Sequence, residues 1–324
     1  YRILTPYNFE MGYPLIQAYN PAVRLKDNNL EMIVRLGSFD PRRTFLGKTL
    51  IDDLGEKLLN EESMIPRKKF KTRLFLRAKL SYESLEDPRI SPFDSTLFFI
   101  TVLRGPGFPI NEPVITWMIQ NNKVAPIIYK DTVLSDNRDS FFVTPKVMAI
   151  RPYYKMDGNS VIALGYVNKN EPNVVEEVFT YEFLLRNDLE EKTGGGTGLR
   201  IGPKKYLLIF HSVYKGKEGI NRKGTTGIYI NYAAILDEEG ELEGKLRYPL
   251  TPMDYPYSGQ RPGTVFVNGA VIVKGAVADK IFPGISTLLK DYDDILVLFS
   301  GLDDESIGIF AGNLTEVLEK MDWN

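Results

Sequence analysis

Short runs of β-branched and aromatic residues recur along the whole chain, and turns rich in Gly, Pro, Asn and Asp separate them. Such runs are typical of β-strands. The predicted strands are 19–25, 30–36, 74–82, 96–103, 114–119, 125–129, 141–150, 160–167, 174–185, 206–214, 226–236, 264–273, 295–300 and 307–310. Only residues 314–321 predict a clear helix, with Asn313 as the N-cap and Glu316 three residues later. These patterns predict an all-β protein.

The number of strands selects among all-β folds. Regularly spaced short strands over 324 residues favour a β-propeller over a single sandwich, and about four strands per blade predicts five blades. Residues 46–59 predict either a short helix or a strand pair, and no long linker divides the chain. We therefore expect residues 1–324 to form a single five-bladed β-propeller domain with a short C-terminal helix.

Composition excludes several kinds of site. The chain has no cysteine, so thiol catalysis and disulfides are excluded, and its only histidine is His211, so a zinc site with two imidazoles is excluded too. The net charge is −2, and no apolar run reaches the length of a membrane span. We expect neither a nucleic acid nor a membrane as partner, no metal, and a cytoplasmic location.

The segment Ser84–Ile90 holds an acidic pair, a proline and an arginine before the apolar run 96–102. Proline favours an extended backbone at Asp87 and sets the direction in which the chain leaves. The pattern therefore predicts a carboxylate held at the mouth of a strand, with the cation of Arg89 nearby. An ordinary surface turn explains the same residues equally well, because Asp and Pro are common in turns.

Three further patterns carry candidate chemistry. Arg138 and Asp139 precede an apolar strand, and His211 closes the apolar run 206–210; in both places structural roles are the simpler interpretation. In the segment 192–198, four glycines follow Lys192, which would let the backbone approach an anion closely. A flexible hairpin explains these glycines equally well. The basic run 66–73 is expected to be a solvated loop.

The order of these segments along nearly the whole chain resembles that of glycoside hydrolase family 130, five-bladed propellers that include mannoside phosphorylases. The matching segments are Asn20-Pro21-Ala22-Val23, Arg35, Glu86-Asp87-Pro88-Arg89-Ile90, Arg138, Lys146, Lys192 with its glycines, Leu207–Val213, Tyr229 with 233–237, Gly259 with Pro262, Val265 and Phe266, and Asp304. The Asp-Pro-Arg signature of the family lies at Asp87-Pro88-Arg89. Two positions differ from the family pattern. Asp139 stands where asparagine is found, and a later arginine is expected to be replaced around Leu164-Gly165-Tyr166.

The resemblance implies roles for individual residues. It makes Asp87 the general acid, which protonates the leaving oxygen directly or through a sugar hydroxyl. The glycosyl unit is expected to contact Asn20, Arg35, Arg89 and Asp304. The phosphate is expected to contact Arg138, Lys192, His211 and Tyr229. The implied reaction is inverting phosphorolysis of β-mannosides to mannose 1-phosphate, with inorganic phosphate as co-substrate and no other cofactor.

Two alternatives stay open. A hydrolase on the same scaffold needs a second carboxylate as base, separated from the acid by roughly 6.5–9.5 Å to admit water; Asp139, Glu190 and Glu191 are the candidates. The second alternative is a propeller that binds sugar without turnover. The carboxylate of Asp139 and the expected replacement of an arginine around 164–166 both reduce the positive charge available to phosphate, which weakens its binding. The linkage cleaved, the acceptor sugar and any homo-oligomer are left open by the sequence.

Overall fold

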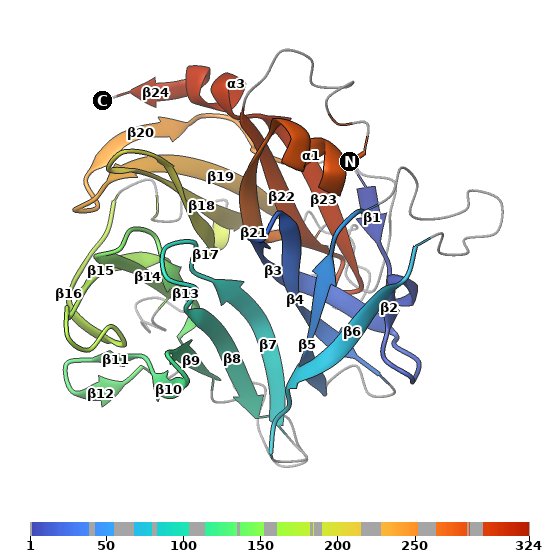
Figure 1. The fold of residues 1–324 in the computed structure, drawn as a ribbon. Coiled ribbons are helices and arrows are strands. Elements are labelled where there is room, and N and C mark those ends of the chain that lie inside the picture. The colour runs from blue at the N-terminus through green and yellow to red at the C-terminus, as the bar shows by residue number, and fades with distance from the viewer. Residues whose placement is uncertain are drawn as a thin grey trace.

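The computed structural model confirms the predicted five-bladed propeller, with five mainly antiparallel sheets around one axis (Figure 1); two of the sheets each contain one parallel strand pair. It describes residues 2–38, 43–54, 68–79, 83–103, 114–134, 137–151, 161–181, 184, 190–214, 228–251, 264–283, 285 and 294–323; the side chains of residues 2, 190–192 and 276 are outside this description. Within this part of the chain, none of the helices has the length and apolar character needed to cross a membrane.

The first three blades follow one another along the chain. Blade 1 contains β3 (Gln17–Lys26), β4 (Asn29–Gly37), β5 (Thr44–Ile51), β6 (Phe70–Leu76) and the short β2 (Phe9–Glu10). Blade 2 contains β7 (Glu83–Ile90), β8 (Leu97–Leu103), β9 (Val114–Gln120) and β10 (Lys123–Pro126). Blade 3 contains β13 (Arg138–Phe142), β14 (Val147–Arg151), β15 (Ala163–Val167), β16 (Val174–Phe179), β11 (Ile128–Tyr129) and β12 (Thr132–Val133).

The two ends of the chain complete the last two blades. Blade 4 contains β17 (Glu190–Gly202), β18 (Lys205–Tyr214), β19 (Ile228–Asp237), β20 (Leu242–Leu246) and the C-terminal β24 (Met321–Trp323). Blade 5 contains β21 (Val265–Lys274), β22 (Asp294–Leu302), β23 (Ser306–Asn313) and the N-terminal β1 (Arg2–Leu4). The first strand thus joins the last blade, which closes the ring and leaves fewer free sheet edges.

Helices are few and short. Those whose bounds lie within the described residues are the 3₁₀ turn η1 (Pro6–Asn8), α1 (Gly275–Ile281) and α3 (Leu314–Glu319). The predicted C-terminal helix and its cap are confirmed, because the Asn313 side chain accepts a hydrogen bond from the Thr315 amide. The sequence missed α1, whose Ala278 and Ile281 pack into the core between blades 5 and 1.

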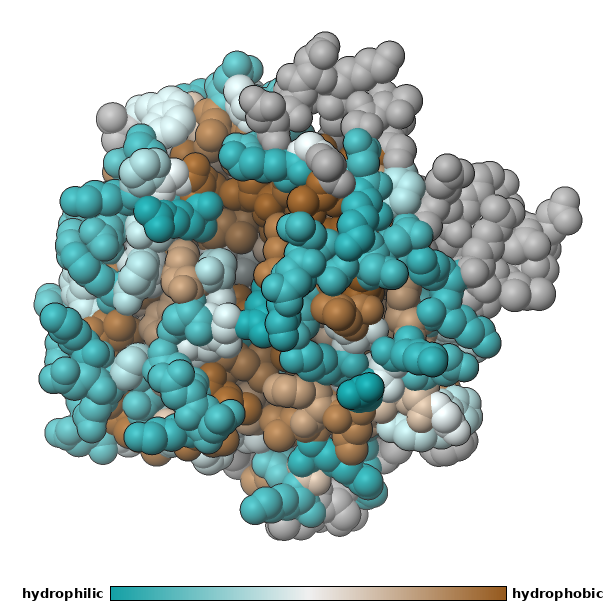
Figure 2. Space-filling model, in the orientation of Figure 1, coloured by the Kyte–Doolittle hydropathy of each residue, from teal (hydrophilic) through white to brown (hydrophobic). Residues whose placement is uncertain are grey.

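Apolar residues from facing sheets fill the spaces between neighbouring blades. One core lies between blades 5 and 1, around Val34, Val271 and Val297, and another runs through blades 2, 3 and 4, around Phe98, Met148 and Leu208. Figure 2 shows polar side chains over the outer strands and hydrophobic side chains between them. Burial between blades holds the inner strand of each blade, β3, β7, β13, β17 and β21, against the axis.

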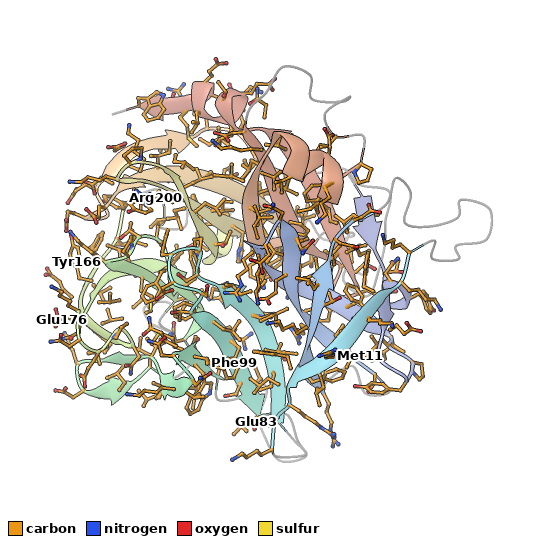
Figure 3. All side chains as sticks on the ribbon, in the orientation of Figure 1. Met11, Glu83, Phe99, Tyr166, Glu176 and Arg200 are labelled. Carbon is orange, nitrogen blue, oxygen red and sulfur yellow. The ribbon has the colours of Figure 1, made fainter. Side chains whose placement is uncertain are left out.

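Several predicted segments fold differently. The basic run 66–73, expected as a solvated loop, enters strand β6 at Phe70, and the strand predicted over 74–82 ends at Leu76 as part of β6. Ser84–Ile90, expected as a turn, forms most of the inner strand β7, and Glu83, labelled in Figure 3, marks where that strand begins. Residues 141–150, expected as one strand, form the end of β13, a tight turn and most of β14. The glycine run after Lys192, for which an anion-binding backbone and a flexible hairpin were both open, lies within the long strand β17.

Those glycines are needed because the inner strands approach one another closely. A Cβ atom at Gly195 would lie 2.3 Å from the ring of Phe141, and one at Gly198 would lie 2.5 Å from the carbonyl oxygen of Phe142. Both contacts are far shorter than van der Waals distance, so only glycine fits at these positions of β17. The run of glycines therefore indicates close packing between inner strands and not a mobile backbone.

Candidate active site

Each inner strand has a bulge at the equivalent position of its blade. The register shifts relative to the second strand fall at Asn20-Pro21, Asp87-Pro88, Asp139-Ser140, Gly196 and Asn268. Asn20, Asp87 and Asp139 have φ angles of 48°, 47° and 60°, a conformation that Asn and Asp adopt more readily than most residues. Bulges re-aim side chains. Here they bring polar groups from different blades into contact, Asn20 with Asp87 and Asp139 with Arg89.

The acid side of the site is centred on Asp87. Its Oδ1 atom accepts hydrogen bonds from Asn20 Nδ2 at 2.7 Å and from Arg35 Nη1 at 3.1 Å. Its side chain is 12% exposed, and within the described residues Oδ2 has no hydrogen-bond partner. Arg35 also pairs with Glu86 at 2.8 Å, so its charge is shared between two carboxylates. One oxygen of Asp87 is thus fixed in place while the other is available to a ligand.

Arg35 is held firmly on the acid side. Its guanidinium lies 4.5 Å from the ring centre of Tyr19, its partner in the register of β3 and β4. Burial disfavours the charged form of Arg35, but Glu86, Tyr19, Asp87 and Asp304 outweigh it and raise its pKa. Burial likewise raises the pKa of the Tyr19 hydroxyl, which therefore stays neutral. Asp304, on the turn between β22 and β23, contributes to both shifts, and its carbonyl oxygen accepts a hydrogen bond from Gln17 Nε2 of β3 at 3.1 Å.

Arg89 lies on the propeller axis and is only 1% exposed. Its guanidinium donates to the carbonyl of Asp87 at 2.9 Å, to Asp139 Oδ1 at 2.6 Å and to the carbonyl of Gly196 at 3.0 Å. These acceptors come from blades 2, 3 and 4. The substrate contact predicted for Arg89 stays a prediction, and its geometry favours a role within the protein framework.

Asp139 is the counter-charge of two buried arginines. Its Oδ1 meets Arg89 at 2.6 Å and its Oδ2 meets Arg151 at 2.7 Å. Burial alone would raise the pKa of Asp139, but Arg151 and Arg89, with His211 and Arg138 behind them, lower it from 3.8 to about 2. Asp139 is therefore ionised at neutral pH and firmly paired, which makes it a poor general base.

The cationic side of the site lies across blades 3 and 4. A Cβ atom at Gly194 would lie within 2.7 Å of both the His211 ring and Arg151 Nη1, so this glycine leaves room for the two side chains. The His211 ring centre lies 5.2 Å from that of Tyr229 and 4.6 Å from that of Phe266. Aromatic packing of this kind fixes the imidazole plane. Histidine, tyrosine and arginine are thus gathered where the sequence predicted a phosphate site.

Two predicted phosphate contacts need separate mention. Arg138 opens β13, pairs in register with Arg151 and is partly exposed. Lys192, on β17, pairs in register with Val213 on β18, but its side chain lies outside the described residues, as do those of Glu190 and Glu191. Among the described residues, no group of three His, Asp or Glu side chains is arranged to hold a metal ion.

Sequence reasoning missed Arg151, although a signal for it exists. Arg151 ends the apolar strand β14 and pairs with the residue before the bulge of β13, as Arg35 pairs with Tyr19 before the bulge of β3. The structure thus places an arginine, Arg151, beside Asp139 and Gly194, outside the segment 164–166 where the sequence suggested that one is replaced. This arrangement, an arginine opposite the residue before a bulge, is repeated in the strand register of the two blades, but the sequence itself shows it only weakly.

The comparisons agree with the fold. No protein-family model and no curated protein matches the chain. Among solved structures, β-1,2-mannobiose phosphorylase from Listeria innocua, in complex with β-1,2-mannobiose, is 16% identical with a TM-score of 0.61, over 98% of this chain and 96% of that one. A mannose phosphorylase from Leishmania mexicana, in complex with phosphate, is 13% identical with a TM-score of 0.58, over 97% and 88%.

A third structure represents glycoside hydrolases of the GH130 family that target β-1,2-mannosidic linkages in Candida mannan. It is 15% identical with a TM-score of 0.52, over 92% of this chain and 85% of that one. At these identities the matches establish a shared fold over nearly the whole chain. The predicted GH130-like propeller is thus confirmed as a fold, and that fold carries both phosphorylases and hydrolases.

Proposed function

We propose that this protein cleaves β-mannosides by inverting phosphorolysis, releasing mannose 1-phosphate. The observation that carries the proposal is the division of the axial site into two sides. Asp87 lies on one, held by Asn20 and Arg35. Arg151 and His211 lie on the other, against Gly194. A carboxyl group on one side and a guanidinium with an imidazole on the other suit proton donation to a leaving oxygen and binding of an attacking anion.

The reaction balances with these groups alone. A phosphate oxygen attacks the anomeric carbon from the face opposite the leaving group, and the bond from that carbon to the glycosidic oxygen breaks. Asp87 supplies the proton that the leaving oxygen takes up, and the proton carried by HPO₄²⁻ restores Asp87 as mannose 1-phosphate forms. Asn20, Arg35 and Asp304 are assigned to the glycosyl unit. Arg138, Arg151, Lys192, His211 and Tyr229 are assigned to phosphate, whose negative charge they offset.

Hydrolysis is the second candidate, favoured by the carboxylate of Asp139 within the cationic side. Two features count against Asp139 as the base that activates water. Both of its oxygens meet arginines, and its pKa of about 2 leaves little affinity for a proton. The negative charge of Asp139 neutralises part of the positive charge on this side of the site. Arg138 forms neither of the two close ion pairs of Asp139, so these pairs do not neutralise its charge. Phosphate therefore remains the better supported acceptor.

The test is product analysis with and without phosphate. β-1,2-Mannobiose, the ligand of the Listeria relative, and β-1,4-mannobiose are incubated with enzyme, and mannose 1-phosphate and free mannose are quantified. Phosphorolysis predicts mannose 1-phosphate only when phosphate is present, and its loss in Asp87→Asn. Asp94→Asn, which changes an exposed carboxylate of the same blade, should retain activity. Free mannose formed equally without phosphate would establish hydrolysis instead, and no turnover of either disaccharide would refute the proposal for these linkages.

A further inference from the structure

The guanidinium of Arg89 joins four blades at the propeller axis. Beyond the carbonyls of Asp87 and Gly196 and the carboxylate of Asp139, its Nη2 atom lies 3.3 Å from the Gly195 carbonyl and 3.5 Å from Asn268 Oδ1. Its Cζ atom is 5.3 Å from the ring centre of Phe266, on blade 5. No simpler side chain offers planar donors in so many directions.

One of these bonds acts on the backbone of the predicted proton donor. Arg89 Nη1 donates to the carbonyl oxygen of Asp87 itself, at 2.9 Å. The neighbouring carbonyl of Pro88 accepts from Asn268 Nδ2 at 3.3 Å. Asp87 has a φ angle of 47°, which is unfavourable for a residue with a Cβ atom and persists only where surrounding contacts hold it. Arg89 and Asn268 supply contacts of this kind.

The other bonds of Arg89 reach the cationic side. Asp139, which accepts from Arg89 at 2.6 Å, also pairs with Arg151 at 2.7 Å. Phe266, beneath the guanidinium of Arg89, packs edge-on against His211 with ring centres 4.6 Å apart. A single buried cation thus contacts the strand that presents the acid and the groups that flank the anion position.

We propose that Arg89 is a positioning residue that sets the placement of Asp87 relative to the bound anion. The proposal rests on the proposed function, because it takes Asp87 as the proton donor. With 1% exposure and its donors directed to protein groups, Arg89 acts through the bulge of β7. Its loss should therefore impair protonation of the leaving oxygen more than it impairs anion binding.

A pair of substrates separates this role from a merely structural one. β-Mannobiose needs a proton on its leaving oxygen, whereas the leaving group of 2,4-dinitrophenyl β-mannoside needs none. For Arg89→Lys we expect kcat on mannobiose to fall by roughly 10²-fold, the cost of a misplacement near 1 Å, and kcat on the aryl mannoside to fall by less than about 10-fold. Arg151→Lys is the matched control, since Arg151 is also buried beside Asp139 but does not touch the Asp87 backbone. It should affect both substrates equally.

Equal losses on the two substrates for Arg89→Lys, in a protein with unchanged circular dichroism, would overturn the proposal, as would undiminished kcat on mannobiose. If Arg89→Lys does not fold, Asn268→Ala serves as the second variant, because it removes the hydrogen bond to the Pro88 carbonyl. We expect it to lower kcat on mannobiose selectively as well, by a smaller factor. The absence of this selective loss would count equally against the proposal. Asp87→Ala tests the premise separately. If this variant lowers kcat equally on mannobiose and on the aryl mannoside, the proton-donor role of Asp87 is refuted, whatever the effect of Arg89→Lys.

Discussion

Replacing Asp139 with asparagine should make the stability of this protein depend on pH in a defined way. The carboxylate neutralises two buried arginines, Arg89 at 2.6 Å and Arg151 at 2.7 Å. Removing one partner of a buried ion pair leaves uncompensated charge, which typically costs about 3–5 kcal/mol. At pH 7 we therefore expect the free energy of unfolding of Asp139→Asn to be lower than that of the wild type by an amount in this range.

The pKa of Asp139 sets how the difference changes with pH. The drop from 3.8 to about 2 in the folded state corresponds to about 2 kcal/mol of stabilisation, at about 1.4 kcal/mol for each pH unit. Because the folded pKa is depressed, this stabilisation is fully present above about pH 4–5 and is lost as the pH falls through the folded value. By pH 3 about 1 kcal/mol of it should be gone. Asparagine does not titrate, so the gap between the two proteins should narrow by that amount between pH 5 and pH 3.

Urea unfolding followed by the fluorescence of Trp117 and Trp323 measures the gap at each pH. The linear extrapolation in urea gives the free energy of unfolding for both proteins. Glu239→Gln is the control, since its carboxylate is exposed and bonded only at the surface, to Lys146; its effect should stay within about 0.5 kcal/mol. A gap for Asp139→Asn that stays constant or widens from pH 5 to pH 3 would refute the account of Asp139 as the counter-charge of the two arginines.

Three further changes test the framework of the site. Gly198→Ala should destabilise the fold by about 1–3 kcal/mol in urea unfolding, because its Cβ would lie 2.5 Å from a carbonyl oxygen of blade 3, whereas Gly312→Ala meets no atom within 4 Å and should be far milder. Asn313→Ala should cost about 1 kcal/mol in the same assay, since it removes the cap of α3, and Asn313→Asp should restore most of that loss. Arg35→Met should lower kcat roughly 10²-fold in the phosphorolysis assay by releasing the predicted proton donor, while Arg24→Met, at the other end of blade 1, should leave kcat unchanged.

Local patterns in the sequence determined the all-β class, the five blades and the capped C-terminal helix. These features depend on side-chain type, turn residues and strand number, which neighbouring residues reveal without long-range information. The ordered motifs also pointed to residues that do meet in space. Asn20, Arg35 and Asp87 are joined by hydrogen bonds on the acid side, although 67 positions separate the first from the last.

The placement of the remaining site residues came only from the tertiary structure. Strand register decides that Arg151 lies beside Asp139, and close packing between inner strands explains the glycines of β17. The sequence placed Arg89 near the carboxylate of Asp87 and, by resemblance, at the glycosyl unit; the structure adds that it is buried and bonded across blades. The physical reason is that bulges and contacts between blades fix where these side chains point, and both involve residues far apart in the sequence. Such contacts leave no local pattern from which they could be read.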